Sequence, residues 1–226
     1  MTGRMAGTPR NIGLSRNGRA LPLWEVAIAG PRLLVFGGIH GDEPASVEAV
    51  AALGERMAGR PPRPHDAGRL WILPSLNPDG IAAGQKNAAS DVDLNRNFPA
   101  TSFTRAHAPG YDPGPHPLSE PESSALARFL EEARVEAVVA VHAPFACVNF
   151  DGPAATWAEA VSQACGWPVR PQIGYPTPGS LGSWLGVDRG LPVLTLELPP
   201  GPLASFRAEA AAALDRAIDY WNPAPP

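Results

Sequence analysis

Short apolar segments alternate along the chain with longer amphipathic segments, and this alternation restricts the fold more than any other feature. The run LLVF at residues 33–36 contains no polar residue, which is typical of a strand buried on both faces of a sheet. Helical spacing follows in residues 43–57, where Val47, Val50 and Leu53 share one face. Strands that alternate with helices in this way indicate an α/β fold.

The same periodicity predicts the remaining elements. We expect strands at 24–29, 32–37, 69–76, 136–141 and 191–198, and helices at 43–57, from 119, at 154–164 and at 204–220. Ser119 lies three residues before Glu122, the spacing of a capping box. Together the elements predict one domain over residues 1–226, an α/β fold with a mixed, mostly parallel sheet and helices on both faces. We expect flexible chain within residues 1–20 and a long active-site loop over residues 77–118.

The composition is that of a globular protein. The chain has 226 residues, of which 44% are hydrophobic and 18% are charged, enough to form one sizeable core. Its net charge of −4 argues against a protein that neutralises a nucleic-acid backbone. No apolar run approaches the ~18–20 residues of a membrane span. We therefore expect neither nucleic acid nor membrane as a partner.

The N-terminal region and the cysteines favour a cytoplasmic location. Arginines at positions 4, 10, 16 and 19 interrupt the first residues, so we expect no secretory signal there. Cys147 and Cys165 form neither a CxxC pair nor a disulfide framework, which predicts a reduced chain.

Histidines and carboxylates gather where the predicted strands end, the place where ligands bind in open α/β sheets. His40 and Glu43 are three residues apart at a predicted helix start, so both side chains can reach one ion. With His142 they form two imidazoles and one carboxylate, a set that leaves one coordination position of zinc open. A single histidine after a strand is often only a hydrogen-bonding residue, so spacing alone leaves metal binding and a structural role both open.

Glu197 ends a strand that we expect to be central in the sheet. An unpaired carboxylate is costly to bury in such a place, so we expect its side chain to face a polar cavity. A glutamate beside a catalytic metal can accept a proton from water as a general base.

Seven motifs in order connect these residues with a known family. They are GIHGDE at 38–43, NPDG at 77–80, DLNRNFP at 93–99, SEPE at 119–122, HAPFAC at 142–147, GYPTPGS at 174–180 with GSW at 182–184, and ELPP at 197–200. The ordered set resembles the zinc carboxypeptidases of the carboxypeptidase A superfamily, and most closely their branch of bacterial murein tripeptide amidases. Any one motif is weak, whereas the ordered set is specific.

The resemblance implies a site as well as a zinc carboxypeptidase-like fold. It implies one zinc ion per chain, bound by His40, Glu43 and His142, with Glu197 as general base and later proton donor. Asn95 and Arg96 match the positions that bind the substrate's terminal carboxylate, which a planar guanidinium meets through two parallel hydrogen bonds. Tyr175 matches a mobile tyrosine that closes over bound substrate.

One position departs from the family. Where its members usually carry an arginine that stabilises the oxyanion, an ungapped reading places Lys86, the single lysine beside 17 arginines. A lysine keeps the charge but loses the planar fork. Lys86 is therefore either an oxyanion donor or, if the loop aligns differently, a solvated residue.

The function implied by the resemblance is hydrolysis of L-Ala-γ-D-Glu-meso-diaminopimelate between D-Glu and diaminopimelate, in the cytoplasm during murein recycling. The partner is then a small peptide substrate, and the oligomeric state stays open. One alternative is an N-acyl amino acid deacylase of the aspartoacylase or succinylglutamate desuccinylase type. Another is a catalytically inactive domain that binds zinc or a ligand, although no ligand or base is missing.

Overall fold

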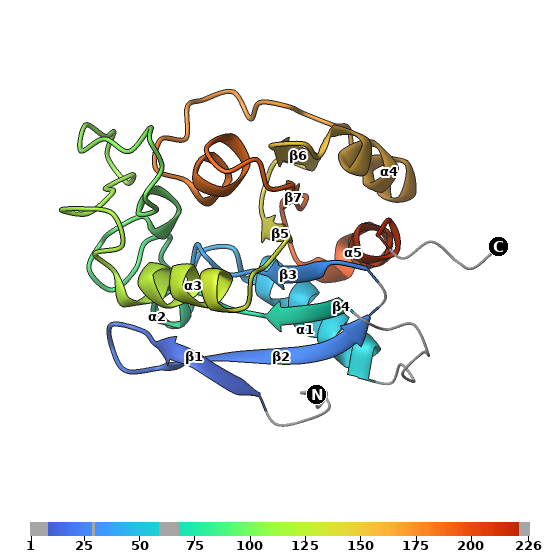
Figure 1. Ribbon diagram of the computed structural model, residues 1–226, viewed down its shortest axis with the longest axis horizontal. Coiled ribbons are helices and arrows are strands. Elements are labelled where there is room, and N and C mark those ends of the chain that lie inside the picture. Colours follow the sequence, from blue (N-terminus) through green and yellow to red (C-terminus); the bar gives the residue numbers. More distant parts are fainter. Residues whose placement is uncertain (1–8, 29, 59–67, 222–226) are drawn as a thin grey trace.

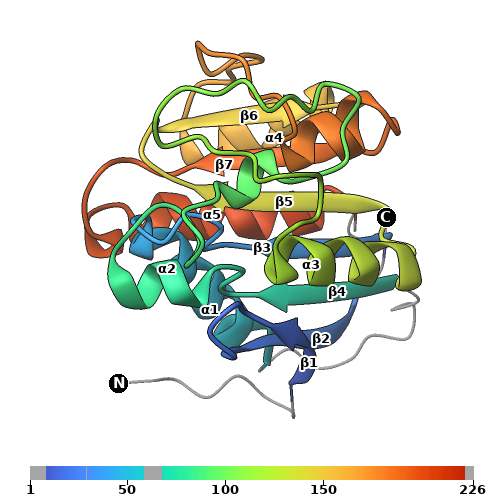
Figure 2. The same ribbon diagram turned by 90° about the vertical axis from the view of Figure 1, so that its left-hand side faces the viewer.

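The computed structural model describes residues 9–28, 30–58 and 68–221. In this part of the chain seven strands form one sheet in the order β1-β2-β4-β3-β5-β7-β6 (Figure 1, Figure 2). The strands are β1 (Arg10–Leu14), β2 (Ala20–Ile28), β3 (Arg32–Phe36), β4 (Gly68–Leu73), β5 (Ala137–His142), β6 (Cys147–Asp151) and β7 (Val193–Glu197). The helices are α1 (Pro44–Ala58), α2 (Pro78–Ala83), α3 (Pro121–Glu132), α4 (Ala155–Cys165) and α5 (Arg207–Asp219).

The centre of the sheet is parallel and its flanks are antiparallel. Strands β4, β3, β5 and β7 pair in parallel, whereas β2 and β6 run antiparallel to their neighbours β4 and β7. This arrangement confirms the predicted mixed, mostly parallel sheet. No helix in the described ranges is long and apolar enough to cross a membrane.

Both faces of the sheet are covered by helices, as predicted from the apolar run at residues 33–36. Leu33 and Val35 belong to the core under α1, α4 and α5, and Leu34 and Phe36 belong to the core under α3. In Figure 2, α3 crosses in front of the sheet and α5 lies behind it. The strand that precedes His40 is thus fixed from both sides.

Two strands were not predicted. β1 lies within residues 1–20, where we expected flexible chain; residues 1–8 are outside the described part. Only Ile12 of β1 is buried, so this edge strand has no alternating pattern to detect. β6 follows β5 after a short turn. Its polar residues Asn149 and Asp151 interrupt the apolar pattern by which a buried strand is recognised. Ala29, predicted to end a strand, lies outside the described residues.

The predicted capping box at the start of α3 is wrong. The helix begins at Pro121, with Glu120 in the cap position and no side-chain cap hydrogen bond. The Ser119 hydroxyl instead accepts from Nδ2 of Asn97 (2.9 Å), and the Glu122 carboxylate accepts from the backbone N–H of Arg16 (2.9 Å). Both side chains of the expected box therefore serve tertiary contacts with other segments.

The segment 77–118 is irregular apart from α2 and a 3-10 turn at Leu94–Arg96. The side-chain amide of Asn97, which is fully buried, orders much of it. It donates to the carbonyl oxygens of Pro113 (2.8 Å) and His116 (3.1 Å) and to the Ser119 hydroxyl (2.9 Å). The hydrogen bonds of this one buried amide thus stabilise a segment that lacks regular backbone pairing.

Candidate active site and metal centre

The predicted metal ligands meet at the carboxyl ends of the parallel strands. His142 and Glu197 are the last residues of β5 and β7 and lie opposite each other in the register. His40 lies in the loop after β3, and Glu43 directly precedes α1. Residues far apart in the sequence therefore share one rim of the sheet, as the strand-end argument predicted.

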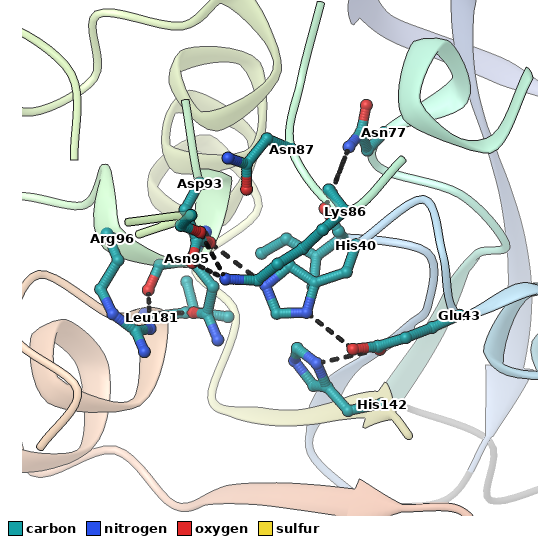
Figure 3. A network of polar contacts seen from close by, with 12 residues as sticks. His40, Glu43, Asn77, Lys86, Asn87, Asp93, Asn95, Arg96, His142 and Leu181 are labelled. Carbon is teal, nitrogen blue, oxygen red and sulfur yellow. Dashed lines mark hydrogen bonds and ion pairs between the residues drawn. The ribbon is translucent and has the colours of Figure 1, made fainter. Parts of the chain in front are cut away.

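Three side chains form a compact ligand cluster (Figure 3). The Nδ1 atom of His40 lies 2.8 Å from Glu43 Oε1, and Nδ1 of His142 lies 3.2 Å from Glu43 Oε2. The candidate ligand atoms all lie within 4.8 Å of one another, and the side chains are at most 12% exposed. Two imidazoles and one carboxylate at this spacing fit a catalytic zinc ion.

Asp93 orients the first of these ligands. Nε2 of His40 lies 3.1 Å from Asp93 Oδ1, so a proton on Nε2 leaves the Nδ1 lone pair free for a metal. The Asp93 side chain is completely buried, and its other oxygen accepts from Nζ of Lys86 at 2.6 Å. The motifs alone do not indicate this role of Asp93. The rule that a metal-binding histidine has a carboxylate partner, applied to the motif at 93–99, could have identified it.

The ligand cluster is strongly polarised. Burial lowers the pKa of His40, but hydrogen bonds to Asp93 and Glu43 outweigh this effect and raise the pKa to about 9. Burial raises the pKa of Glu43, but the charge and hydrogen bond of His142 outweigh it and lower the pKa to about 2. Burial opposes ionisation of Asp93 as well, but the hydrogen bond and charge of His40 outweigh it and lower the pKa of Asp93. Both carboxylates that contact His40 are therefore ionised at neutral pH, which suits the binding of a cation.

Glu197 is separate from this cluster and is suited to act as a base. It is 4% exposed, and its Oε2 atom is buried with no hydrogen-bond partner in the described part of the chain. Burial raises the pKa of its carboxyl. A buried carboxylate with one oxygen free and a raised pKa is a stronger proton acceptor than an exposed one.

The NPDG motif supports the His40 loop and does not enter the site. The Asn77 side chain accepts from Gly80 N (2.8 Å) and donates to the carbonyl oxygens of Ile39 (3.3 Å) and Lys86 (3.2 Å). The two segments approach so closely that a Cβ atom on Gly41 would lie 2.0 Å from the carbonyl carbon of Gly80. Glycine at position 41 is thus required by backbone contact.

Asn95 and Arg96 line the same cavity as the metal ligands. This cavity has a volume of about 630 Å³ and also contains Glu197 and Tyr175 in its wall. Arg96 is buried and donates from Nη1 to the carbonyl oxygen of Asn95 (2.7 Å), while Asn95 Oδ1 accepts from Leu181 N (3.1 Å). The Asn95 amide NH₂ and the rest of the guanidinium remain as donors for a carboxylate.

Tyr175 lies in the wall of this cavity, in an irregular segment rich in glycine and proline. Its side chain is 40% exposed, and its ring lies 6.4 Å from that of Phe145. The position is compatible with the predicted contact to substrate, which stays a prediction.

Lys86 lies beside the ligand cluster. Its Nζ atom donates to Asp93 Oδ2 (2.6 Å) and to the Gly110 carbonyl (2.9 Å), and it lies 3.6 Å from the centre of the Tyr111 ring. The residue also lines a smaller depression with His40 and Tyr175. It is therefore not a solvated loop residue, and its ammonium group is held next to the partner of a metal ligand.

Tyr111 is a site residue that the sequence did not reveal. Its ring lies between Lys86 and Arg96, whose guanidinium carbon is 5.2 Å from the ring centre, and it is 6.0 Å from the ring of Tyr175. A single aromatic residue in a glycine- and proline-rich loop carries no periodic signal, so only the folded loop shows its position.

Comparison with known proteins agrees with this geometry. The zinc carboxypeptidase family matches residues 8–160, so the chain belongs to this family and is a zinc-dependent hydrolase. Among the described residues, His40, Glu43 and His142 form one group that could bind the ion. Among its relatives, murein peptide amidase A of Escherichia coli (strain K12) is 34% identical over 206 residues, covering 83% of this chain and 82% of the relative. The corresponding protein of Vibrio campbellii is 33% identical over 207 residues, covering 85% and 80%. The crystal structure of murein-tripeptide amidase from Escherichia coli O157 superposes with a TM-score of 0.79 at 28% identity, covering 100% of this chain and 96% of that one. The resemblance inferred from the motifs is thereby confirmed.

Proposed function

We propose that this protein hydrolyses the amide bond between γ-D-glutamate and meso-diaminopimelate in L-Ala-γ-D-Glu-meso-diaminopimelate. One observation carries the proposal: a single cavity holds the ligand cluster, the Glu197 carboxylate and the donors of Asn95 and Arg96. A site of this kind can bind a free carboxylate and hydrolyse the amide bond next to it. Similarity to murein peptide amidases over most of both chains supports the choice of substrate.

Substrate binding is assigned to the carboxylate of the leaving residue. Arg96 offers two parallel N–H groups to this carboxylate, and the Asn95 amide adds a further donor. Tyr175 covers the bound residue from the opposite loop. These contacts hold the scissile amide next to the residues that carry out the chemistry.

The chemistry requires a proton acceptor, a proton donor and stabilisation of negative charge. Zinc bound by His40, Glu43 and His142 supplies Lewis-acid activation of water and of the amide carbonyl. Glu197 accepts a proton as the water oxygen bonds to the carbonyl carbon. Lys86 donates to the oxygen that becomes negative. The carbon–nitrogen bond then breaks, and Glu197 returns the proton to the leaving amine.

We place this reaction in the cytoplasm, in the recycling of murein peptides. The two free, buried cysteines support this placement.

A substrate panel tests the proposal. Purified protein is assayed with the tripeptide, with N-acetyl-aspartate and with N-succinyl-glutamate. We expect the tripeptide to be hydrolysed with the highest kcat/KM. Faster hydrolysis of either N-acyl amino acid would identify a deacylase, and zinc binding without turnover of any compound would identify an inactive domain.

A further inference from the structure

The side chain of Tyr111 forms a wall that three depressions share. It lines the main cavity together with Arg96 and Glu197, and it lines the smaller depression that contains Lys86. It also borders a third depression of about 440 Å³, between residues 104–113 and 175–178. One partly buried side chain therefore adjoins both Lys86 and Arg96.

Two cationic groups lie against this ring. Nζ of Lys86 is 3.6 Å from the ring centre, and the guanidinium carbon of Arg96 is 5.2 Å from it. The face of an aromatic ring carries negative potential and attracts a cation within ~6 Å of its centre. Lys86 and Arg96 repel each other because their charges are alike, whereas the ring attracts both. Tyr111 therefore offsets part of the repulsion between them.

The loop that carries Tyr111 also holds the ammonium group directly. Nζ of Lys86 donates to the backbone carbonyl of Gly110 (2.9 Å) and to Asp93 Oδ2 (2.6 Å). The loop is attached to the same segment by a hydrogen bond from Asp93 N to the carbonyl oxygen of Asp112 (2.8 Å). An ammonium group has three N–H donors, so these contacts leave one for a substrate oxygen. The carboxylate, the carbonyl and the ring together restrict the position of the nitrogen.

We propose that Tyr111 is a positioning residue whose ring fixes the ammonium group of Lys86 and the guanidinium group of Arg96 for the reaction. The inference rests on the proposed function, in which Lys86 stabilises the oxyanion and Arg96 binds the substrate carboxylate. A side chain that is already held in its productive position loses less conformational entropy in the complex and in the transition state. Loss of the ring should therefore lower kcat through Lys86 and raise KM through Arg96.

The first test removes the ring. In Tyr111→Leu we expect kcat to fall and KM to rise, each by about threefold to thirtyfold, the range of cation–π contacts from exposed to desolvated sites. Tyr111→Phe keeps the ring and should stay within about twofold of the parent values. Tyr220→Leu is the control, because its ring also lies near an arginine, Arg216 at 5.8 Å, but outside the cavity. Equal losses in Tyr111→Phe and Tyr111→Leu would assign the effect to the hydroxyl and overturn the inference.

The second test changes the electrostatics of the ring and leaves its shape nearly unchanged. Tyr111 is replaced with phenylalanine that carries no, one, two or three fluorine atoms on the ring. Fluorine withdraws electron density from the ring face and so weakens its attraction for cations. We expect kcat/KM to fall stepwise along the series, while circular dichroism shows that each protein stays folded. Equal kcat/KM values along the series would show that the ring only fills space.

Double variants identify the groups through which the ring acts. In the Lys86→Ala background, Tyr111→Leu should still raise KM but should no longer lower kcat. In the Arg96→Ala background, it should still lower kcat but should no longer raise KM. Losses of the same size in every background would show that the ring acts independently of both cations, which contradicts the proposed role.

The two proposals fail in different ways. All kinetics use the compound of the substrate panel that the parent enzyme hydrolyses fastest. If that compound is an N-acyl amino acid, the proposed function is wrong, and the variants still decide the role of Tyr111. If the tripeptide is preferred but the ring acts independently of the cations, the function stands and the role of Tyr111 is wrong. A parent protein that hydrolyses none of the compounds overturns both.

Discussion

The ammonium group of Lys86 lies 2.6 Å from Oδ2 of Asp93, whose other carboxylate oxygen contacts the candidate metal ligand His40. The single lysine of the chain is therefore connected to the metal site through one carboxylate. This contact leaves two roles to be separated by experiment: donation to the oxyanion, which we propose, and orientation of His40 through Asp93.

Lys86→Ala separates these roles. If Lys86 donates to the oxyanion, kcat should fall by ~10²–10³, as when one oxyanion donor is removed, while zinc affinity stays unchanged. Lys86→Arg should recover much of the rate, because the charge returns. Steady-state kinetics and a zinc titration of each variant provide the measurements. A parallel loss of zinc affinity would assign Lys86 to the positioning of His40, and an unchanged kcat would remove it from the mechanism.

Glu197→Gln tests the general base. The amide keeps the size and polarity of the side chain but cannot accept a proton, so kcat should fall by at least ~10²–10⁴. Zinc should remain bound at one equivalent, because the candidate ligands His40, Glu43 and His142 are unchanged. Metal analysis and turnover are measured on the same preparation. A variant that keeps the parent kcat would place the base elsewhere.

Arg96→Ala should affect binding more than chemistry. We expect KM to rise about tenfold to a hundredfold with a smaller change in kcat, because the proposed contact of the guanidinium with the substrate carboxylate would exist in ground and transition states alike. A substrate with an amidated carboxylate should be poor for the parent enzyme and little worse for the variant. Arg207→Ala, at an exposed position at the start of α5, is the control. A pure kcat effect would contradict the assignment.

Asp79 should stabilise the fold in a pH-dependent way. Its side chain is 1% exposed and accepts from Ser15 Oγ (3.0 Å), Asn17 N (2.9 Å) and Arg19 Nη1 (2.5 Å). Although burial opposes ionisation, these bonds lower the pKa of Asp79. Its stabilisation is therefore present above the unfolded-state pKa near 4 and is lost as the pH falls through the lower folded-state value.

Asp79→Asn should accordingly lower the free energy of unfolding by about 2 kcal/mol at pH 7, the scale of hydrogen bonds to a charged group. The difference from the parent should shrink toward pH 3. Urea unfolding at both pH values measures it, with Glu159→Gln, at an exposed position on α4, as the control. A difference that does not depend on pH would contradict the proposed linkage.

The meeting of the candidate metal ligands at one rim could be predicted from sequence, because the strands that carry them have strong patterns. The apolar run at residues 33–36 and its counterparts before His142 and Glu197 indicate buried parallel strands, and the polar residue after each must lie at one rim. The family motifs then assigned the remaining roles.

The site residues that could not be predicted from the sequence lie in segments without a regular hydrophobic pattern. β6 is short and half polar, so the sequence did not indicate a strand there. The position of Asp151 on the cavity wall could therefore not be predicted. Tyr111 depends on the path of an irregular segment that is ordered by the buried amide of Asn97. The predicted capping box does not form because the Glu122 carboxylate accepts a hydrogen bond from the distant backbone N–H of Arg16. The spacing of neighbouring residues cannot predict such a tertiary contact.

The most direct test of the account is zinc-dependent release of diaminopimelate from the tripeptide. Protein carrying one equivalent of zinc is incubated with L-Ala-γ-D-Glu-meso-diaminopimelate, and the products are identified by mass spectrometry. We predict free diaminopimelate and L-Ala-D-Glu, loss of the reaction after chelation, recovery on adding zinc, and no zinc retention by His142→Ala. An unchanged rate in fully metal-depleted protein, or cleavage at the L-Ala bond instead, would contradict it.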